Sequence, residues 1–451
     1  MSEYTRVYGY GPQHKRLGPR SEELYKDAAK VIPGAVTSNV RATLPAFFVK
    51  RADGSYIYDV DGNEYIDYVM AMGALLFGHA RPKSMIEAVK EQLEKGVVYG
   101  QSHELECKVA KELVNTIPCA EMVRFCNSGT EAVEHAIRIA RGFTQKEKIA
   151  KFEGGYHGHI DQIAISSHPP ELDKAGPSTA PIAVTDSRLG VPKNMRNNIV
   201  ILPYNNEEAI KSIMGAYEDE LAALICGGGP YIPPEKGFFK FLRDITKENG
   251  AILIWDEVLT GFRMALGGAQ EFYGVTPDMS VFGKVLGGGF PIGVVVGRKD
   301  LMELVNPTPG SSVPEGERVY YAGTFNGNAI TMTAALAVLK ELKERPPYDR
   351  INRISHEIME GLEDMVKRLE LKAQVLKYGP IPQLYFTEQE ITDYRNILTA
   401  DPNMSREFID RMIERKILCF SHGFFLSASH TMEDKERTLE AAETVLKALK
   451  A

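Results

Sequence analysis

The sequence has no excess of positive charge. It contains 53 lysine and arginine residues against 60 aspartate and glutamate residues, which gives a formal net charge of −7. Proteins that bind nucleic acids or anionic membranes obtain much of their affinity from basic surfaces. The charge balance therefore argues against both kinds of partner.

Cysteines are few, odd in number and scattered along the chain. They lack the close spacing that zinc sites and disulfide scaffolds use. The five residues are Cys107, Cys119, Cys126, Cys226 and Cys419. Because this usage suits a reducing compartment, we expect a cytoplasmic protein.

Long apolar runs are also absent. No stretch approaches the roughly 18 apolar residues that mark a membrane-spanning helix. The first twenty residues contain no apolar run of the kind that a targeting signal carries. We expect a soluble protein with no membrane partner, whose first residues form an arm ahead of the folded part.

The chain pattern predicts an α/β fold. An amphipathic helix at 21–31 precedes aromatic runs with Asp-Gly turns at 47–69, which predict a small antiparallel meander. Seven short apolar runs then alternate with helical segments, one of which begins at Phe238. These runs lack alternation and therefore predict mostly parallel strands buried on both faces; they lie at 122–126, 149–152, 199–202, 222–226, 251–255, 280–282 and 292–296.

The last third of the chain predicts a smaller α+β domain. A long helix begins near Ala329, strand candidates lie at 384–386 and 424–427, and a final helix begins at Thr431 with capping-box spacing to Asp434. The predicted domains are an N-terminal segment with arm, helix and meander (1–75), a large α/β domain (76–330) and a small α+β domain (331–451).

A small-residue turn after the first predicted strand of the large domain suits anion binding. Asn127, Ser128, Gly129 and Thr130 join that strand to a helical pattern. Unpaired amides, the positive end of the helix and the threonine hydroxyl together form an anion site. The alternative is a simple helix N-cap.

Two acidic residues end another predicted strand. Ligands of open α/β sheets bind beyond the carboxyl ends of the strands, so a carboxylate there is well placed to meet one. Asp256 can hold a positively charged heterocyclic nitrogen. The alternative, that one of the pair only caps the next helix, suits Glu257.

Lys284 follows the end of the next predicted strand, and three consecutive glycines follow at 287–289. A buried lysine has a lowered pKa that suits Schiff-base chemistry, and the glycines allow a bulky group to approach the backbone. The alternative is an ordinary surface lysine.

Two further segments carry candidate binding residues. Tyr156, with His157 beside it, has a ring that can stack on a flat cofactor, or it is an ordinary aromatic residue at a strand end. Thr324 lies in a loop rich in Gly and Asn, where it can donate to a phosphate or only form a turn.

These constellations and their order resemble the class III aminotransferases, which are pyridoxal-5′-phosphate (PLP) enzymes of fold type I, and within them the glutamate-1-semialdehyde 2,1-aminomutase branch. The resemblance implies a large domain with a mostly parallel central sheet, and a small α+β domain built from N- and C-terminal segments. It rests on nine segments in order: PGAVTSNVRA, DVDGNEYIDYV, FGHARP, NSGTEA, FEGGYHGH, WDEVLTGFR, GKVLGGGFPIG, AGTFNGN and FLSASHTMEDKERTLEAAE.

By this resemblance, Lys284 forms the Schiff base with PLP and moves the proton between substrate and cofactor. Asp256 pairs with the pyridinium nitrogen, which makes the ring an electron sink. Gly129 and Thr130 bind the cofactor phosphate, and Ser128 lies beside them.

The resemblance also implies the remaining contacts. Tyr156 stacks on one face of the cofactor ring and Val258 packs on the other. Thr324 reaches the phosphate from the neighbouring subunit, which implies a homodimer with active sites at the subunit interface. Arg41 holds the substrate carboxylate. No metal is implied.

The sequence departs from the aminomutase pattern in four segments that border the substrate pocket of that branch. The loop at 225–234 (ICGGGPYIPP) is shorter and lacks a glutamate, and changes also lie at 321–328, 379–383 and 419–427. Aromatic residues in these segments indicate a more apolar or aromatic substrate, or they fill core space; they are Tyr231, Phe325, Phe420 and Phe424.

Three functions remain open. An altered pocket with an intact cofactor set favours an aminotransferase that moves an amino group between an amino acid or amine and an oxo acid, through a pyridoxamine phosphate intermediate. The alternative is the aminomutase, or an amino-acid racemase of the same fold. The third is a cofactor-binding protein without catalysis, which the presence of both Lys284 and Asp256 argues against.

Overall fold

The computed structural model describes residues 18–44, 47–169, 172–185, 189–227, 231–420 and 423–450. Residues 1–17, which make up most of the predicted N-terminal arm, lie outside the described residues. The chain divides into two compact units. Unit 1 comprises residues up to Arg81, Pro347–Ile391 and Arg395–Ala451, and unit 2 comprises Pro82–Pro346 with Thr392–Tyr394. The chain passes from unit 1 to unit 2 after Arg81 and back to unit 1 after Pro346, whereas the predicted domain boundaries follow residues 75 and 330. The predicted domain boundaries stay a prediction.

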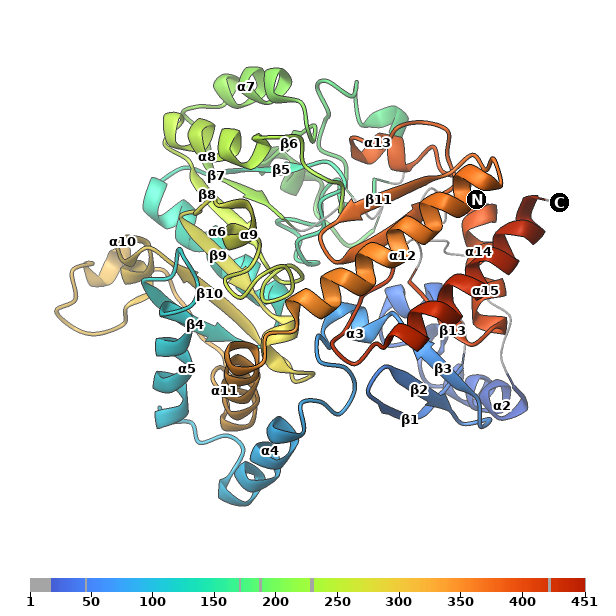
Figure 1. The fold of residues 1–451 in the computed structure, drawn as a ribbon. Helices are drawn as coiled ribbons and strands as arrows, with labels where there is room; N and C mark the ends of the chain where they lie inside the picture. The colour runs from blue at the N-terminus through green and yellow to red at the C-terminus, as the bar shows by residue number, and fades with distance from the viewer. Residues whose placement is uncertain are drawn as a thin grey trace. The chain divides into compact units, whose positions relative to one another are not determined.

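Unit 2 is built on a seven-stranded sheet with the order β4-β10-β9-β8-β7-β5-β6 (Figure 1). Only β10 runs antiparallel to its neighbours, so the mostly parallel sheet is confirmed. All seven predicted runs are strands, with bounds within one residue of the prediction. They are β4 (Met122–Cys126), β5 (Lys148–Phe152), β6 (Ile199–Leu202), β7 (Leu221–Cys226), β8 (Ile252–Asp256), β9 (Met279–Phe282) and β10 (Gly293–Gly297).

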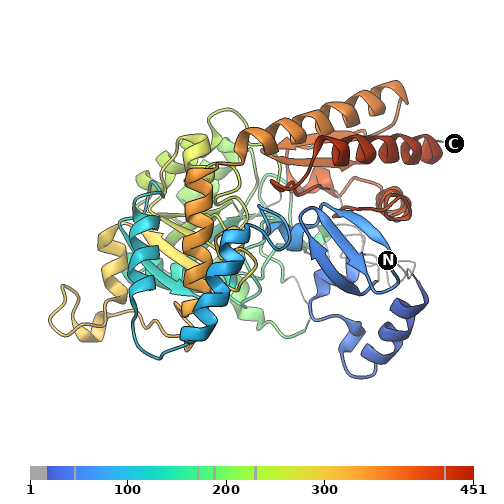
Figure 2. The same cartoon turned by 60° about the horizontal axis from the view of Figure 1, so that its bottom comes forward.

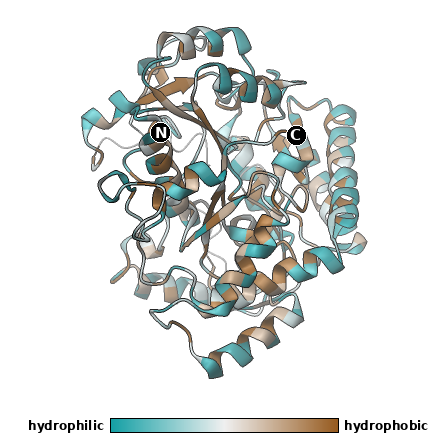
Figure 3. Cartoon of the chain, turned by 90° about the vertical axis from the view of Figure 1, so that its left-hand side faces the viewer, coloured by the Kyte–Doolittle hydropathy of each residue, from teal (hydrophilic) through white to brown (hydrophobic). Residues whose placement is uncertain are grey.

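Helices cover this sheet because its strands are apolar on both faces. The strands are coloured brown in Figure 3, whereas the surrounding helices carry both teal and brown. One core joins Val133, Ala136 and Ile137 of α6 to Ile225 and Ile254 of the sheet. The helices are α4 (Lys83–Lys95), α5 (Glu104–Val114), α6 (Gly129–Thr144), α7 (Glu207–Ala216), α8 (Phe238–Glu248), α9 (Ala269–Tyr273), α10 (Lys299–Met302) and α11 (Ala329–Glu344). Helix α8 is the predicted crossover, and α11 packs beside α4 and α5 (Figure 2).

Unit 1 joins segments from both ends of the chain. The predicted meander is confirmed as β1 (Val49–Asp53), β2 (Tyr56–Asp59) and β3 (Glu64–Asp67), and β13 (Ile417–Leu418) pairs with β3 in parallel. The other elements are α2 (Pro19–Ala28), α3 (Met70–Gly73), α12 (Tyr348–Arg368), α13 (Tyr394–Ile397), α14 (Pro402–Glu414), α15 (Met432–Lys450) and the hairpin β11 (Gln374–Tyr378) to β12 (Ile381–Tyr385). Helix α12 packs along α15 (Figure 1).

One predicted strand in this unit is wrong. Residues 424–427 form no strand, because successive amides bond to two different parts of unit 1, β12 and the residue after β3, rather than along one partner strand. Phe424 N–H donates to Pro382 O, at 3.0 Å, and Phe425 N–H donates to Tyr68 O, at 2.8 Å. The predicted strand at 384–386 corresponds to β12, which begins three residues earlier and ends one residue earlier than predicted. Its partner β11 was not predicted from the sequence pattern.

A buried carboxylate ties the meander to the final helix. Asp434 is fully buried and accepts hydrogen bonds from the hydroxyls of Tyr56 (2.5 Å) and Ser55 (3.0 Å). It also accepts the Thr431 N–H at 2.9 Å and returns its own N–H to the Thr431 hydroxyl at 3.1 Å. This is the predicted capping box, and it connects two segments almost 380 residues apart.

We expect Asp434→Ala to lower the free energy of unfolding by about 2–4 kcal/mol, because two hydroxyls and one amide lose their acceptor in a buried place. Urea unfolding measures the change. Glu433→Ala, at an exposed position in the same first turn, is the matched control and should change stability little. Equal effects of the two substitutions would refute the structural role of Asp434.

Candidate active site

The sheet register brings the predicted site segments of unit 2 to one edge. Cys126 at the end of β4 pairs with Gly293, and the adjacent Val294 pairs with Phe282 at the end of β9. Val281 in turn pairs with Asp256 at the end of β8. The turn after β4, Asp256 and Lys284 therefore follow the carboxyl ends of strands in one sheet, where open α/β sheets bind ligands.

A histidine holds Asp256 in place. The segment after β5 brings His157 Nδ1 within 2.8 Å of Asp256 Oδ2, and both side chains are buried. Burial lowers the pKa of His157, so the imidazole is neutral and donates its Nδ1–H to the carboxylate. Asp256 Oδ1 accepts the Val258 N–H at 3.0 Å. The sequence analysis named His157 only as the neighbour of Tyr156, and no local pattern indicated its contact with Asp256.

The N-terminus of α6 presents free donors. Ser128 is the N-cap, and its hydroxyl accepts the Glu131 N–H at 3.1 Å. Among the described residues, no acceptor takes the N–H of Gly129 or Thr130. A Cβ on Gly129 would lie 2.8 Å from a methyl group of Val258, so only glycine allows this close packing. Ser128 therefore caps α6, and the two amides after it stay available to an anion.

Lys284 lies just after β9 in a strained backbone, with φ 40. Burial lowers the pKa of its amine from 10.5 to about 8, while Asp256 opposes this shift and the Arg263 guanidinium adds to it. The amine is therefore more readily deprotonated than a surface lysine, as nucleophilic chemistry requires. The surface-lysine alternative does not describe this residue.

Glu257 has the capping role that the sequence allowed for it. Its carboxylate accepts the N–H groups of Ala269 (2.9 Å) and Gln270 (3.0 Å) at the start of α9, and the Thr260 hydroxyl at 2.5 Å. Strand alternation directs it away from Asp256, since successive side chains point to opposite faces. Burial raises the pKa of Glu257.

Tyr156 and Thr324 are accessible. Tyr156 is 48% exposed, beside the buried His157. Thr324 is exposed on a loop that is fixed to the same sheet edge, because Asn127 Nδ2 donates to Asn326 Oδ1 at 2.9 Å and the Tyr321 hydroxyl donates to Phe125 O at 3.1 Å.

A family model for class-III aminotransferases matches residues 37–432. The chain belongs to the class III aminotransferase family.

This class III chain is 41% identical, over 435 residues, to a glutamate-1-semialdehyde 2,1-aminomutase of Methanosphaera stadtmanae, covering 95% of this chain and 98% of the relative. An ω-transaminase structure from Sphaerobacter thermophilus matches with a TM-score of 0.90 at 32% identity, covering 98% of this chain and 100% of that one. A structure of a transaminase with PLP bound matches with a TM-score of 0.85 at 26% identity, covering 96% and 99%. The predicted family and fold are confirmed, and PLP is the cofactor of this enzyme family.

The residues of unit 2 fit that cofactor. The free amides of Gly129 and Thr130 suit its phosphate, the carboxylate of Asp256 suits its ring nitrogen, and the amine of Lys284 suits its aldehyde. Among the described residues, no group of three or more His, Cys, Asp or Glu side chains could hold a metal ion, and no helix is long and apolar enough to cross a membrane.

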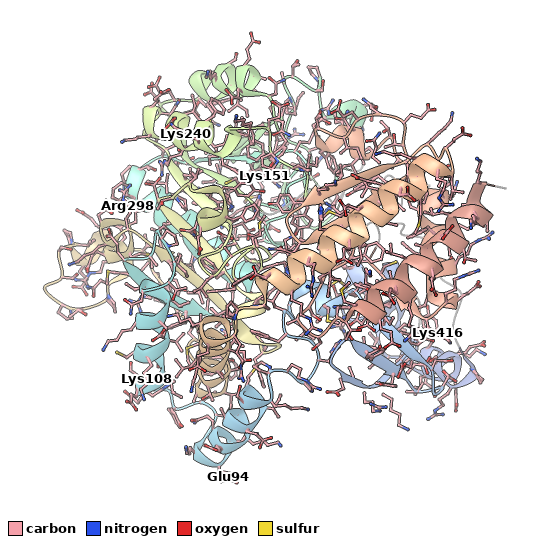
Figure 4. The ribbon with its side chains drawn as sticks, viewed as in Figure 1. Glu94, Lys108, Lys151, Lys240, Arg298 and Lys416 are labelled. Atoms are coloured by element: carbon pink, nitrogen blue, oxygen red, sulfur yellow. The ribbon has the colours of Figure 1, made fainter. Side chains whose placement is uncertain are left out.

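The sequence analysis did not identify two buried cationic side chains of unit 2. Lys151 is fully buried in β5 (Figure 4), where its Nζ donates to Ile163 O (3.2 Å), Ile165 O (2.7 Å) and the Ser167 hydroxyl (2.8 Å). Arg263 is also fully buried, and burial lowers its pKa to about 10. A lysine inside the apolar run IAKF was the available signal for the first.

Arg41 belongs to unit 1. It lies in a short 3₁₀ helix, Asn39–Thr43, and is exposed, with its Nη1 donating to the Thr37 hydroxyl at 2.9 Å. Its role toward a substrate carboxylate stays a prediction from the resemblance.

The aromatic residues in the four departing segments have different surroundings. Phe424 is 1% exposed and meets Tyr68 edge to face, and Phe420 packs on the apolar cluster around Tyr65. Both fill core space of unit 1. Phe325, in contrast, is 58% exposed. The segment 379–383 begins with the turn between β11 and β12. Residues 228–230 and 421–422, within two of the segments, lie outside the described residues.

We expect Lys284→Met to stabilise the cofactor-free protein at pH 7 by about 1–3 kcal/mol. The pKa of the amine is about 8 when folded and 10.5 when unfolded. The penalty for burying the charged amine is therefore complete below pH 8 and disappears as the pH rises through 10.5.

Urea unfolding of both cofactor-free proteins at pH 7 and pH 10 tests this expectation, and the difference should shrink at pH 10. Lys240→Met, at an exposed position on α8, is the control and should not stabilise the protein in this way. A wild-type protein as stable as the Lys284→Met variant at pH 7 would contradict the burial argument.

Proposed function

We propose that this protein is a PLP-dependent glutamate-1-semialdehyde 2,1-aminomutase. The observation that carries the proposal is the 41% identity to an aminomutase across 95% of the chain. The assembled site of unit 2 supports it, because Lys284, Asp256 and the α6 N-terminus have the geometry and chemistry that the cofactor needs.

PLP supplies a carbonyl that condenses with amines and a ring that withdraws electrons from the adjoining carbon. In the proposed enzyme, the Lys284 amine, with its pKa near 8, binds that carbonyl and moves a proton at the substrate carbon. Asp256, oriented by His157 through the 2.8 Å bond, keeps a proton on the ring nitrogen. A buried carboxylate stabilises that positive nitrogen more than water does.

The remaining residues bind and orient. Gly129 and Thr130 hold the phosphate through backbone N–H groups and a hydroxyl, while Ser128 caps the helix beside them. Val258, packed against Gly129, supports one face of the ring, and the exposed Tyr156 covers the other.

We also propose a cytoplasmic homodimer in which Thr324 completes the phosphate site of the partner. Apolar side chains around the Thr324 loop support a second copy of the chain as partner. Tyr320 is 79% and Phe325 58% exposed, and the half-exposed Val97 lies close by because its carbonyl accepts the Ala329 N–H at 3.1 Å. The five free cysteines suit a reducing compartment.

An aminotransferase is the second candidate. The ω-transaminase structure at 32% identity and TM-score 0.90 favours it. So does the end of β7, where Cys226 and Gly227 stand at the position at which the aminomutase pattern has a glutamate.

Purified enzyme supplied with glutamate-1-semialdehyde alone tests the proposal. We expect conversion to 5-aminolevulinate without any oxo acid, and no conversion by Lys284→Ala, which lacks the amine. If conversion fails, but amino acids or amines react only when 2-oxoglutarate or pyruvate is added, the protein is an aminotransferase. Inversion of an amino acid without any oxo acid would identify a racemase.

Arg41→Ala tests the predicted carboxylate contact. An arginine fork binds a carboxylate by paired hydrogen bonds, so we expect KM to rise by roughly ten- to hundred-fold for the carboxylate substrate, with kcat less affected. Steady-state kinetics measure both constants. Arg51→Ala, in β1 of the same unit, is the control. An unchanged KM in the Arg41 variant would place this residue outside the pocket.

A further inference from the structure

His159 is placed at the N-terminus of α6 by the two residues before it. His157 is anchored to Asp256 at 2.8 Å. Gly158 has φ +93 and passes directly over Thr130, since a Cβ there would lie 2.8 Å from the Thr130 hydroxyl and 3.0 Å from its Cα. The His159 imidazole, as a result, lies with Nδ1 3.4 Å from the Thr130 hydroxyl oxygen.

Among the described residues, no carboxylate forms an ion pair with His159. Glu131, the acidic residue in the first turn of α6, directs its carboxylate to the Asn127 N–H at 2.7 Å. The side chain of His159 is exposed. An imidazole beside the positive end of a helix gains stability from an anion bound between them.

The N-terminus of α6 and His159 therefore offer hydrogen-bond donors to an anion. They are the N–H groups of Gly129 and Thr130 and the pair formed by the Thr130 hydroxyl and the His159 imidazole. The hydrogen bond between the last two uses one of their hydrogens, and in either direction of that bond another hydroxyl or imidazole hydrogen stays free for an anion. A phosphate has several acceptor oxygens and matches such a set of donors.

We propose that His159 is a ligand of the cofactor phosphate, in addition to the backbone groups and hydroxyl of the α6 N-terminus. This inference rests on the proposed function, because it concerns the same PLP site. His159 raises the affinity for the phosphorylated cofactor and has no contact with its aldehyde or ring.

Comparison of PLP with pyridoxal, which lacks the phosphate, isolates this contact. Cofactor-free wild type, His159→Ala and His159→Gln are titrated with each compound. Trp255, the single tryptophan, adjoins Asp256 and reports binding through quenching of its fluorescence. We expect His159→Ala to weaken PLP binding roughly ten-fold, the usual size of a lost hydrogen bond to a charged group, and to leave pyridoxal binding unchanged.

His159→Gln keeps a side-chain N–H donor and should recover part of the affinity for PLP. Inorganic phosphate should compete with PLP for the wild-type site more effectively than for the site of His159→Ala. The control is His356→Ala, which removes a 59% exposed histidine of α12 paired with Glu360 and should bind both compounds as wild type does.

Two results would overturn the inference: unchanged PLP affinity in His159→Ala, or equal losses for PLP and pyridoxal, which indicate a general structural defect. A failure of the proposed function would give different results from a failure of this inference. If wild type binds neither compound, the PLP site itself is wrong; if wild type converts the semialdehyde while His159→Ala binds PLP normally, only the role of His159 is wrong.

Discussion

The buried hydrogen bond between His157 and Asp256 is the interaction on which the site depends. It links the segment after β5 to the end of β8, two strands that are not neighbours in the sheet. The bond fixes the orientation of the carboxylate and, through the residues next to His157, the placement of Tyr156, Gly158 and His159. A single 2.8 Å contact thereby positions the groups that we propose for the ring and for the phosphate of one cofactor.

The same sheet edge concentrates buried charge. Lys151 and Arg263 are fully buried cations, Lys284 is a partly buried one with a lowered pKa, and Asp256 and Glu257 are buried acids. Such groups are costly to bury unless each has partners. Lys151 finds carbonyl and hydroxyl oxygens, Glu257 finds the α9 amides, and the depressed pKa of Lys284 shows the remaining cost. That cost suits the nucleophilic role that we propose for this amine.

Unit 1 follows a different principle, since it is assembled from distant parts of the chain. The pairing of β13 with β3 and the bonds from Ser55 and Tyr56 to Asp434 join its N- and C-terminal segments. In the same unit, Met70, Ala71 and Met72 all have positive φ, and Asp67 supports this left-handed turn by accepting the N–H groups of Val69 and Met70. Conformations of this kind persist only where the surroundings hold them.

The sequence by itself determined the seven strands of unit 2, the meander, the cap of α15 and the strand-end positions of Asp256 and Lys284. These features are local: apolar runs bounded by turns, and a side chain that bonds three residues away, need no knowledge of distant segments. Tertiary structure alone decided that β13 extends the meander and that residues 424–427 form no strand. It also decided that Lys151 is buried, and that His157 supports Asp256 while His159 faces Thr130. Each of these depends on which segments meet after folding, and residues 99 positions apart, such as His157 and Asp256, carry no local pattern that records their contact.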